Sequence, residues 1–322
     1  MPKTSIEWLR DERLKDCRTS GATMGTRYTA RFVVSRHAQV QAIVADLESA
    51  VTAVDMQMSN WKPGSDLSRL NRAAPDTWIP VPANLASVLA RAIEIGRETC
   101  NAFNIGVGEL VDTWGFGPAG GRGPRGASAG PHACRPVDEL LEVDVPGRRA
   151  RKHARVALDL CGIAKGFGVD ELARVLDRHD VGSWLVGIDG EMRARGCRPD
   201  GSPWAIALEA PEDGRRAAMG VIELGDAAIA TSGDYRHWIE IGGARISHTM
   251  DPRTGAPLQG DVASVTVIAQ TCADADAYAT ALMVLGAEAG RGHARRRGLD
   301  ALFVARKDGE LRTTGTGVFG DA

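Results

Sequence analysis

The sequence lacks several patterns that would assign a protein of this size directly. No stretch of the 322 residues approaches the ~18 consecutive apolar residues that a membrane-spanning helix needs. The formal net charge is only −2, so the composition gives no case for nucleic acid as a partner. Neither a Walker A loop nor a GxGxxG fingerprint opens a helix, so neither common nucleotide-binding fold is predicted.

Zinc-binding and export signals are also missing. The six cysteines lie far apart, without CxxC or another zinc-ligand spacing: Cys17, Cys100, Cys134, Cys161, Cys197 and Cys272. We interpret them as free, mostly structural thiols, which suits a reducing compartment. Residues 1–18 lack the apolar run of about 7 to 15 residues found in a signal peptide. Cys17 follows charged residues and not a lipoprotein signal, so a cytoplasmic protein is expected.

Short segments of strand and helix periodicity predict an α+β fold. Helical spacing of apolar residues predicts helices over 38–58, 83–100 and 273–285, the last capped by Thr271 or Asp274. Strands are expected at the remaining apolar or alternating segments, which are 28–34, 156–160, 184–188, 204–208, 221–224, 227–231 and 264–269. Tight turns between several strands favour a mixed, mainly antiparallel sheet with packed helices. The length suits one large domain or two closely joined lobes, of which we favour the second.

Residues 117–131 are rich in glycine and proline. Such a composition predicts a flexible surface loop without regular structure. Its arginines are an alternative contact surface for a partner, but an unstructured insertion is the favoured interpretation.

The stretch from Ser247 to Gly255 gathers an imidazole, a carboxylate, a guanidinium and several hydroxyls. The strand-like segment 236–241 precedes it, and its Asp-Pro and Thr-Gly pairs are typical of turns. We therefore expect His248 and Arg253 on a loop at a sheet edge, where functional sites are often built. The alternative is a tight turn whose His248 and Arg253 only satisfy nearby carbonyls.

The segment around Lys165 has the order strand, glycine-bearing turn, lysine, helix. This order presents backbone N–H groups and a cation to phosphate oxygens. The alternative is an ordinary strand-to-helix turn whose Lys165 points to solvent, and the residues alone leave the two balanced.

Asp276 and Thr280 are four residues apart on the predicted helix 273–285, so they share one face. A carboxylate and a hydroxyl are hard oxygen ligands that suit Mg²⁺ bound partly through substrate phosphates. Such a pair is usually a solvated helix face, but this helix is otherwise made of small and apolar residues. A carboxylate there is expected to be hydrogen-bonded or metal-bound.

Six motifs in order resemble the ApbE-type FAD:protein FMN transferases. They are Gly21-Ala22-Thr23-Met24-Gly25-Thr26, Met58-Ser59-Asn60-Trp61, Asp159-Leu160-Cys161-Gly162-Ile163-Ala164-Lys165-Gly166, Thr231-Ser232-Gly233-Asp234-Tyr235, His248-Thr249-Met250-Asp251-Pro252-Arg253-Thr254-Gly255 and Ala275-Asp276-Ala277-Tyr278-Ala279-Thr280. Each motif is weak alone, but six at plausible spacing are specific. The resemblance covers 21–322 as one flavin transferase domain and leaves 1–20 as an N-terminal extension.

The resemblance implies a Mg²⁺-dependent enzyme that attaches FMN from FAD to a Thr or Ser hydroxyl of a client flavoprotein, such as a redox or reductase subunit. The product is a phosphoester, and AMP is released. The FAD-lining residues that it implies are Met24, Trp61, Ala102, Phe103, Asn104, Asp159, Lys165 and Met250. It also implies metal ligands at Gly162 (through its carbonyl), Asp276 and Thr280, with Asp276 and His248 as the catalytic residues.

Four positions depart from the pattern of that family. Trp61 replaces the usual Tyr, Asn104 replaces Asp, and Cys161 replaces Gly. Asp189-Gly190 replaces a Gly-Gly pair. A tryptophan still stacks on a flat ring system, whereas Asn104 is expected to weaken a charge-assisted contact to FAD.

Other assignments remain open from the sequence. We expect Arg253 to pair with Asp251 as a structural residue. Ser20-Gly21-Ala22-Thr23 resembles the end of a client acceptor motif, but it overlaps the family's own N-terminal motif. Two other functions fit the same residues, a Mg²⁺-dependent FAD pyrophosphatase giving FMN and AMP, and a non-catalytic FAD-binding protein.

Overall fold

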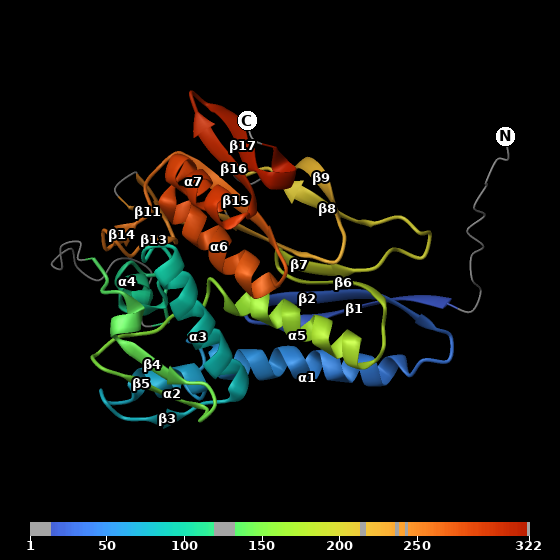
Figure 1. Ribbon diagram of the computed structural model, residues 1–322, viewed down its shortest axis with the longest axis horizontal. Coiled ribbons are helices and arrows are strands. Elements are labelled where there is room, and N and C mark those ends of the chain that lie inside the picture. The colour runs from blue at the N-terminus through green and yellow to red at the C-terminus, as the bar shows by residue number, and fades with distance from the viewer. Residues whose placement is uncertain (1–13, 119–132, 213–216, 236–237, 242–243, 321–322) are drawn as a thin grey trace.

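An eight-stranded sheet organises the protein, and the computed structural model describes residues 14–118, 133–212, 217–235, 238–241 and 244–320. The strand order is β1-β2-β6-β7-β10-β15-β16-β17, and every neighbouring pair is antiparallel (Figure 1). The strands are β1 (Leu14–Thr23), β2 (Thr26–Ser35), β6 (Ser183–Ile188), β7 (Glu191–Arg195), β10 (Ala228–Gly233), β15 (Val262–Ala269), β16 (Asp300–Lys307) and β17 (Glu310–Thr316). The expected α+β fold with a mainly antiparallel sheet is confirmed.

Three long helices pack against this sheet and against one another. They are α1 (Val40–Met58), α5 (Ala164–Arg178) and α6 (Cys272–Leu285), and α5 lies between the other two (Figure 1). The Thr271 hydroxyl accepts a hydrogen bond from the Asp274 N–H at 3.2 Å, so Thr271 is the residue that caps α6. The short helix α7 (Ala287–Arg297) follows α6 directly.

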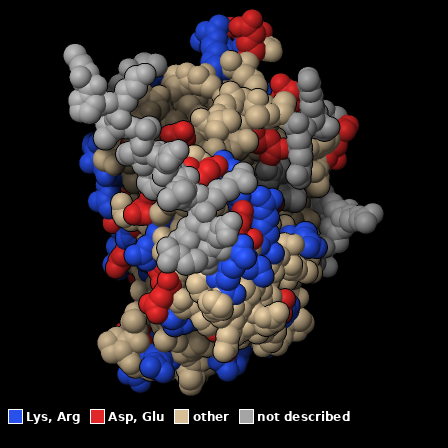
Figure 2. Space-filling view, turned by 90° about the vertical axis from the view of Figure 1, so that its right-hand side faces the viewer, with Lys and Arg blue, Asp and Glu red and all other residues tan. Residues whose placement is uncertain are grey.

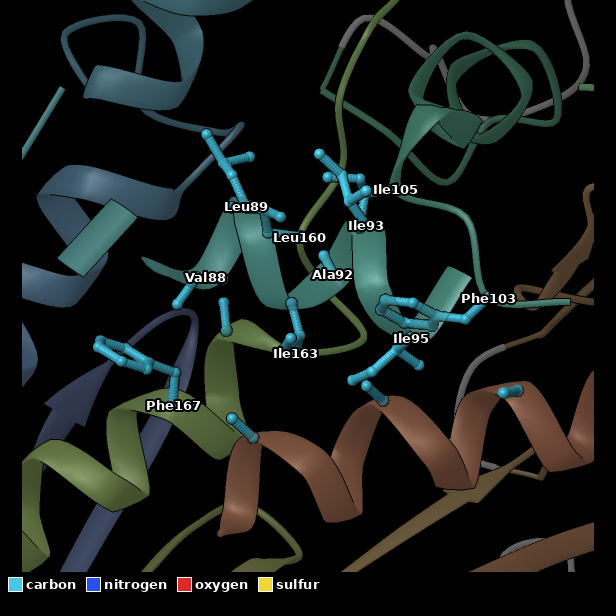
Figure 3. Packing of buried hydrophobic residues seen from close by; sticks show 14 of the residues in the cluster. Val88, Leu89, Ala92, Ile93, Ile95, Phe103, Ile105, Leu160, Ile163 and Phe167 are labelled. Atoms are coloured by element: carbon cyan, nitrogen blue, oxygen red, sulfur yellow. The ribbon is translucent and has the colours of Figure 1, made fainter. Parts of the chain in front are cut away.

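A second group of elements lies beside α1 and α6. It contains a three-stranded sheet in the order β3-β5-β4 and five helical segments. Their bounds are α2 (Asp66–Arg72), β3 (Ile79–Pro80), α3 (Ala83–Glu98), the 3₁₀ helix η1 (Ile105–Val107), α4 (Gly108–Thr113), the 3₁₀ helix η2 (Val137–Glu139), β4 (Leu141–Asp144) and β5 (Arg149–Lys152). Figure 3 shows the apolar face of α3 packed against Phe103, Ile163 and Phe167. This core therefore supports the turn that leads into α5.

Two hydrophobic clusters form most of the core. One joins α3, α6 and the turn before α5, and the other joins β1, β2, β6, α1 and α5. Met24, at the turn between β1 and β2, packs against both clusters. The clusters are therefore in contact through a residue of the first motif.

Smaller hairpins complete the described chain. They are β8 (Trp204–Glu209) with β9 (Ala218–Leu224), β11 (Trp238–Ile241) with β12 (Ala244–Ser247), and β13 (Met250–Asp251) with β14 (Ala256–Pro257), followed at the C-terminal end by the 3₁₀ helix η3 (Gly317–Phe319). His248 lies in the short connection between β12 and β13, so β12 separates it from the strand that the sequence predicts at 236–241.

The prediction of a strand at residues 156–160 is wrong. The segment is largely buried, but it joins no sheet. The Asn71 side chain donates to the Leu158 carbonyl at 2.9 Å and accepts from the Leu158 N–H at 2.8 Å. The Lys152 ammonium donates to the Val156 carbonyl at 3.1 Å, and the Gly108 N–H donates to the Ala157 carbonyl at 3.0 Å. Side chains and loops thus satisfy backbone groups that a neighbouring strand would otherwise bind.

Two predicted segment boundaries have different outcomes in the structure. The N-terminal extension predicted to end at residue 20 ends inside β1, because residues 14–23 pair with β2. Most of the glycine-rich segment predicted at 117–131 lies outside the described residues, as does the start of the strand expected at 236–241.

Basic and acidic side chains lie next to one another on the surface that Figure 2 shows. Ion pairs such as Arg31 with Asp16, at 2.6 Å, join neighbouring strands. None of the helices in the described ranges is long and apolar enough to cross a membrane.

Candidate active site

The turn that precedes α5 is shaped by Asp159. One carboxylate oxygen accepts a hydrogen bond from the Cys161 N–H at 2.7 Å, and the other accepts from the Asn60 side chain at 2.7 Å. Asn60 comes from the loop after α1, next to Trp61. Asp159 therefore ties the proposed flavin-stacking loop to the turn that carries Gly162.

Lys165 does not extend into bulk solvent. Its ammonium lies 2.7 Å from a carboxylate oxygen of Glu191 and 3.6 Å from one of Asp189. Burial opposes the charge, but the carboxylates of Glu191, Asp276 and Asp189 outweigh it and raise the pKa of Lys165. Lys165 thus supplies a positive charge at the start of α5, where the neighbouring N–H groups of Ala164 and Gly166 already bind the Leu160 carbonyl and Asp276.

Asp276 is 4% exposed and points toward the first turn of α5. One of its oxygens accepts a hydrogen bond from the Gly166 N–H at 3.1 Å. Burial and the nearby Glu191 carboxylate raise the pKa of Asp276 to about 7, against the opposing effects of Lys165 and the Gly166 N–H. A cation beside this carboxylate would favour its ionised form.

Thr280 lies one turn further along α6 and faces the same turn before α5. Its hydroxyl is 3.0 Å from the Ser232 hydroxyl, and a Cβ placed on Gly162 would lie 3.2 Å from the Thr280 oxygen. Gly162 therefore lies directly against Thr280. Because the Gly166 N–H bonds to Asp276, it does not bond to the Gly162 carbonyl, and within the described chain that carbonyl accepts no hydrogen bond.

These groups fit a magnesium ion. A buried carboxylate, a hydroxyl and an unused carbonyl are all hard oxygen donors, which Mg²⁺ prefers. Nowhere in the described ranges do three His, Cys, Asp or Glu side chains gather as a metal site. The donor set therefore suits an ion that is held partly by substrate phosphates.

The expected flavin-lining residues differ in exposure. Trp61 is 61% exposed, whereas Ala102, Phe103 and Met250 are buried. Phe103 packs close to Gly162, with a ring carbon 3.3 Å from where a Gly162 Cβ would lie. Trp61 is thus the residue of this group with a ring face available for stacking.

Asn104 is buried, and its amide is used within the protein. The amide oxygen accepts from the Gly106 N–H at 2.6 Å, and the amide nitrogen donates to the Asn101 side chain and the Arg135 carbonyl. Its side chain therefore shapes the loop around Phe103.

The loop that carries His248 is fixed to α6. Arg253 forms two hydrogen bonds with the Asp251 carboxylate, at 2.9 and 2.8 Å, and donates to the Val284 carbonyl at 2.8 Å. The structural pairing expected for Arg253 is confirmed. The His248 ring makes an edge contact with the Phe116 ring, with 6.3 Å between centroids.

A cavity of about 300 Å³ lies between this loop and the C-terminal end of α6, lined in part by Asp234, Arg253 and Gly286. It borders the end of α6 that is distant from Asp276.

The acceptor-like sequence at Ser20–Thr23 is part of β1. Thr23 is buried and pairs with Thr26 at the end of the β1–β2 hairpin. Its hydroxyl is therefore not presented as an acceptor.

Sequence reasoning missed Asp170, a fully buried carboxylate on α5 that bonds to the start of α6. The signal was present, because Asp170 lies between Val169 and Leu172 on the apolar stripe of the helix. The argument applied to Asp276, that a carboxylate on an apolar helix needs partners, applies here equally.

Comparison with known proteins shows the family of the chain. The model of the ApbE family matches residues 24–303. A protein of Vibrio cholerae serotype O1 named FAD:protein FMN transferase is 36% identical over 291 residues, which covers 90% of this chain and 87% of that protein. A Haemophilus influenzae protein of the same name is 35% identical over 316 residues, covering 93% and 89%. The crystal structure of the apo flavinyl transferase ApbE of Pseudomonas stutzeri superposes with a TM-score of 0.85 at 36% identity, covering 96% of this chain and 98% of that one.

Fold and site thus define an α+β protein of the flavin transferase class. The chain belongs to the ApbE family, which confirms the resemblance seen in its six motifs.

Proposed function

We propose that this chain transfers FMN from FAD to a Thr or Ser hydroxyl of a client flavoprotein, in a Mg²⁺-dependent reaction that releases AMP. The observation that carries the proposal is the meeting of Asp276, Thr280 and the unused Gly162 carbonyl beside Lys165. The names of the relatives support the same substrates.

The reaction exchanges one bond to phosphorus for another. The acceptor hydroxyl oxygen attacks the phosphorus on the FMN side of the FAD diphosphate. The bond from that phosphorus to the bridging oxygen breaks, and AMP leaves with the oxygen. The protein contributes mainly position and electrostatics to such a step.

The residues divide this work between them. Gly162, Asp276 and Thr280 hold Mg²⁺, which neutralises charge on the diphosphate when it is bound. Lys165, kept charged by its carboxylate partners, binds a phosphate oxygen. His248 accepts or orients the acceptor proton, and Trp61 stacks on the flavin or adenine ring.

The test is to incubate the protein with FAD and Mg²⁺, with and without a client peptide that contains the acceptor Thr. Release of AMP only with the client, together with a peptide mass raised by FMN, is expected. Equal AMP release without the client would instead indicate a FAD pyrophosphatase. FAD binding without any AMP release would indicate a non-catalytic binder.

A further inference from the structure

Carboxylates near the starts of α5 and α6 each cap the first turn of the other helix. Asp170, on α5 and 1% exposed, accepts hydrogen bonds from the Cys272 N–H and the Ala273 N–H of α6, both at 3.0 Å. In the other direction, Asp276 of α6 accepts from the Gly166 N–H of α5. Each helix therefore supplies the carboxylate that binds unpaired N–H groups of the other.

The two helix starts also touch backbone to backbone. A Cβ on Gly166 would lie 2.2 Å from the Cys272 carbonyl oxygen, so only glycine permits this approach. Asp170 lies one turn after Gly166, and Asp276 lies one turn after Cys272. The two caps therefore fix both the separation and the register of α5 and α6.

The Thr271 hydroxyl binds only the Asp274 N–H, so the N–H groups of Cys272 and Ala273 depend on Asp170. Arg193 of β7 donates to Asp170 at 2.7 Å, which ties the carboxylate to the sheet as well. Burial nevertheless raises the pKa of Asp170 against these hydrogen bonds. A buried carboxylate is costly unless it is hydrogen-bonded, and Asp170 is held by all three of these donors, two on α6 and one on β7.

We propose that Asp170 is a positioning residue that places Asp276 and Thr280 opposite Gly162 and Lys165. The proposal rests on the proposed function, because it takes Asp276 and Thr280 as the metal ligands. Asp170 fixes the first turn of α6, and the two ligands follow on that helix within the next two turns. A displacement of α6 would move both ligands together relative to the turn before α5.

The test is Asp170→Asn. The carboxylate accepts three hydrogen bonds through two oxygens, but an amide has one acceptor oxygen and turns its NH₂ group toward at least one of the same donors. Loss of a residue that orients metal ligands typically weakens metal affinity about 10- to 100-fold. We expect that loss for Mn²⁺, used as a spectroscopic probe in the presence of FAD without acceptor. The Mg²⁺ concentration that half-saturates FMN transfer should rise equally, while FAD affinity without metal stays parental.

Asp177→Asn is the matched control. Asp177 lies on the same helix, but it pairs with Arg195 at the surface and with the Trp184 indole. The Mn²⁺ affinity of the Asp177→Asn variant is expected to equal that of the parent protein. If Asp177→Asn loses as much Mn²⁺ affinity as Asp170→Asn, the positioning role is refuted. Any substitution that weakens α5 would then be enough to weaken metal binding.

Two further variants separate the possible failures. If Asp170→Asn does not fold, as judged by circular dichroism, Arg193→Met decides the matter. It removes one of the three donors, and a smaller loss of Mn²⁺ affinity supports the proposal, whereas parental affinity refutes it. Asp276→Asn tests the proposed function itself, because unchanged metal binding there would remove the metal site. Loss of binding in Asp276→Asn with parental binding in a folded Asp170→Asn would refute only the positioning role.

Discussion

Asn71, at the end of α2, is predicted to be a main support of the turn before α5. Its side chain forms two hydrogen bonds with the backbone of Leu158, at 2.9 and 2.8 Å, as a neighbouring strand would. Leu158 is buried, so Asn71→Ala leaves one N–H and one carbonyl without a partner. Each unsatisfied buried group costs about 1 to 3 kcal/mol, which gives a loss of roughly 2 to 6 kcal/mol in the free energy of unfolding.

Urea denaturation followed by circular dichroism measures this loss. Asn84→Ala is the control, because Asn84 lies on α3 and its side chain forms no hydrogen bond with the described residues. The control is expected to stay within about 0.5 kcal/mol of the parent. If Asn71→Ala also stays within that range, the Asn71 hydrogen bonds do not stabilise the segment 156–160.

Three variants test the active site directly. Asp276→Ala removes the carboxylate of the proposed metal ligands, so Mg²⁺-dependent FMN transfer should disappear, and near-parental turnover in a folded variant would contradict the assignment. Trp61→Ala should weaken FAD binding by roughly one to two orders of magnitude, because stacking on an aromatic ring is worth ~1–3 kcal/mol, whereas Trp61→Tyr should retain most of it in calorimetry. His248→Ala should lower FMN transfer ~10²–10⁴-fold with FAD affinity unchanged, and a parallel loss of affinity would make it a binding residue.

Local patterns in the sequence predicted elements whose determinants are local. The helix predicted at 273–285 is α6, which begins at Cys272, and of the two predicted caps, Thr271 and Asp274, the structure shows Thr271. The pairing of Arg253 with Asp251 spans two residues within one turn. Both were confirmed because no distant part of the chain has to be known.

The predictions that were wrong or undecided depend on residues far away in the sequence. The apolar run at 156–160 has the composition of a buried strand, and only Asn71 and Lys152 show that no strand lies beside it. The environment of Lys165 was likewise undecided, because Glu191 lies 26 residues away on another element. The reciprocal caps join positions more than 100 residues apart, as the bond from Cys272 to Asp170 shows. Pairings at such separations follow from the fold and not from any window of sequence.

The Asp189 departure from the family pattern shows how the site tolerates a change. Asp189 has φ of 58°, a left-handed conformation that glycine adopts freely and that Asp tolerates better than most residues. The turn between β6 and β7 therefore keeps its shape despite the side chain. That side chain adds a second carboxylate near the Lys165 ammonium, beside Glu191. Asp189 is therefore one of the carboxylates that raise the pKa of Lys165, after Glu191 and Asp276.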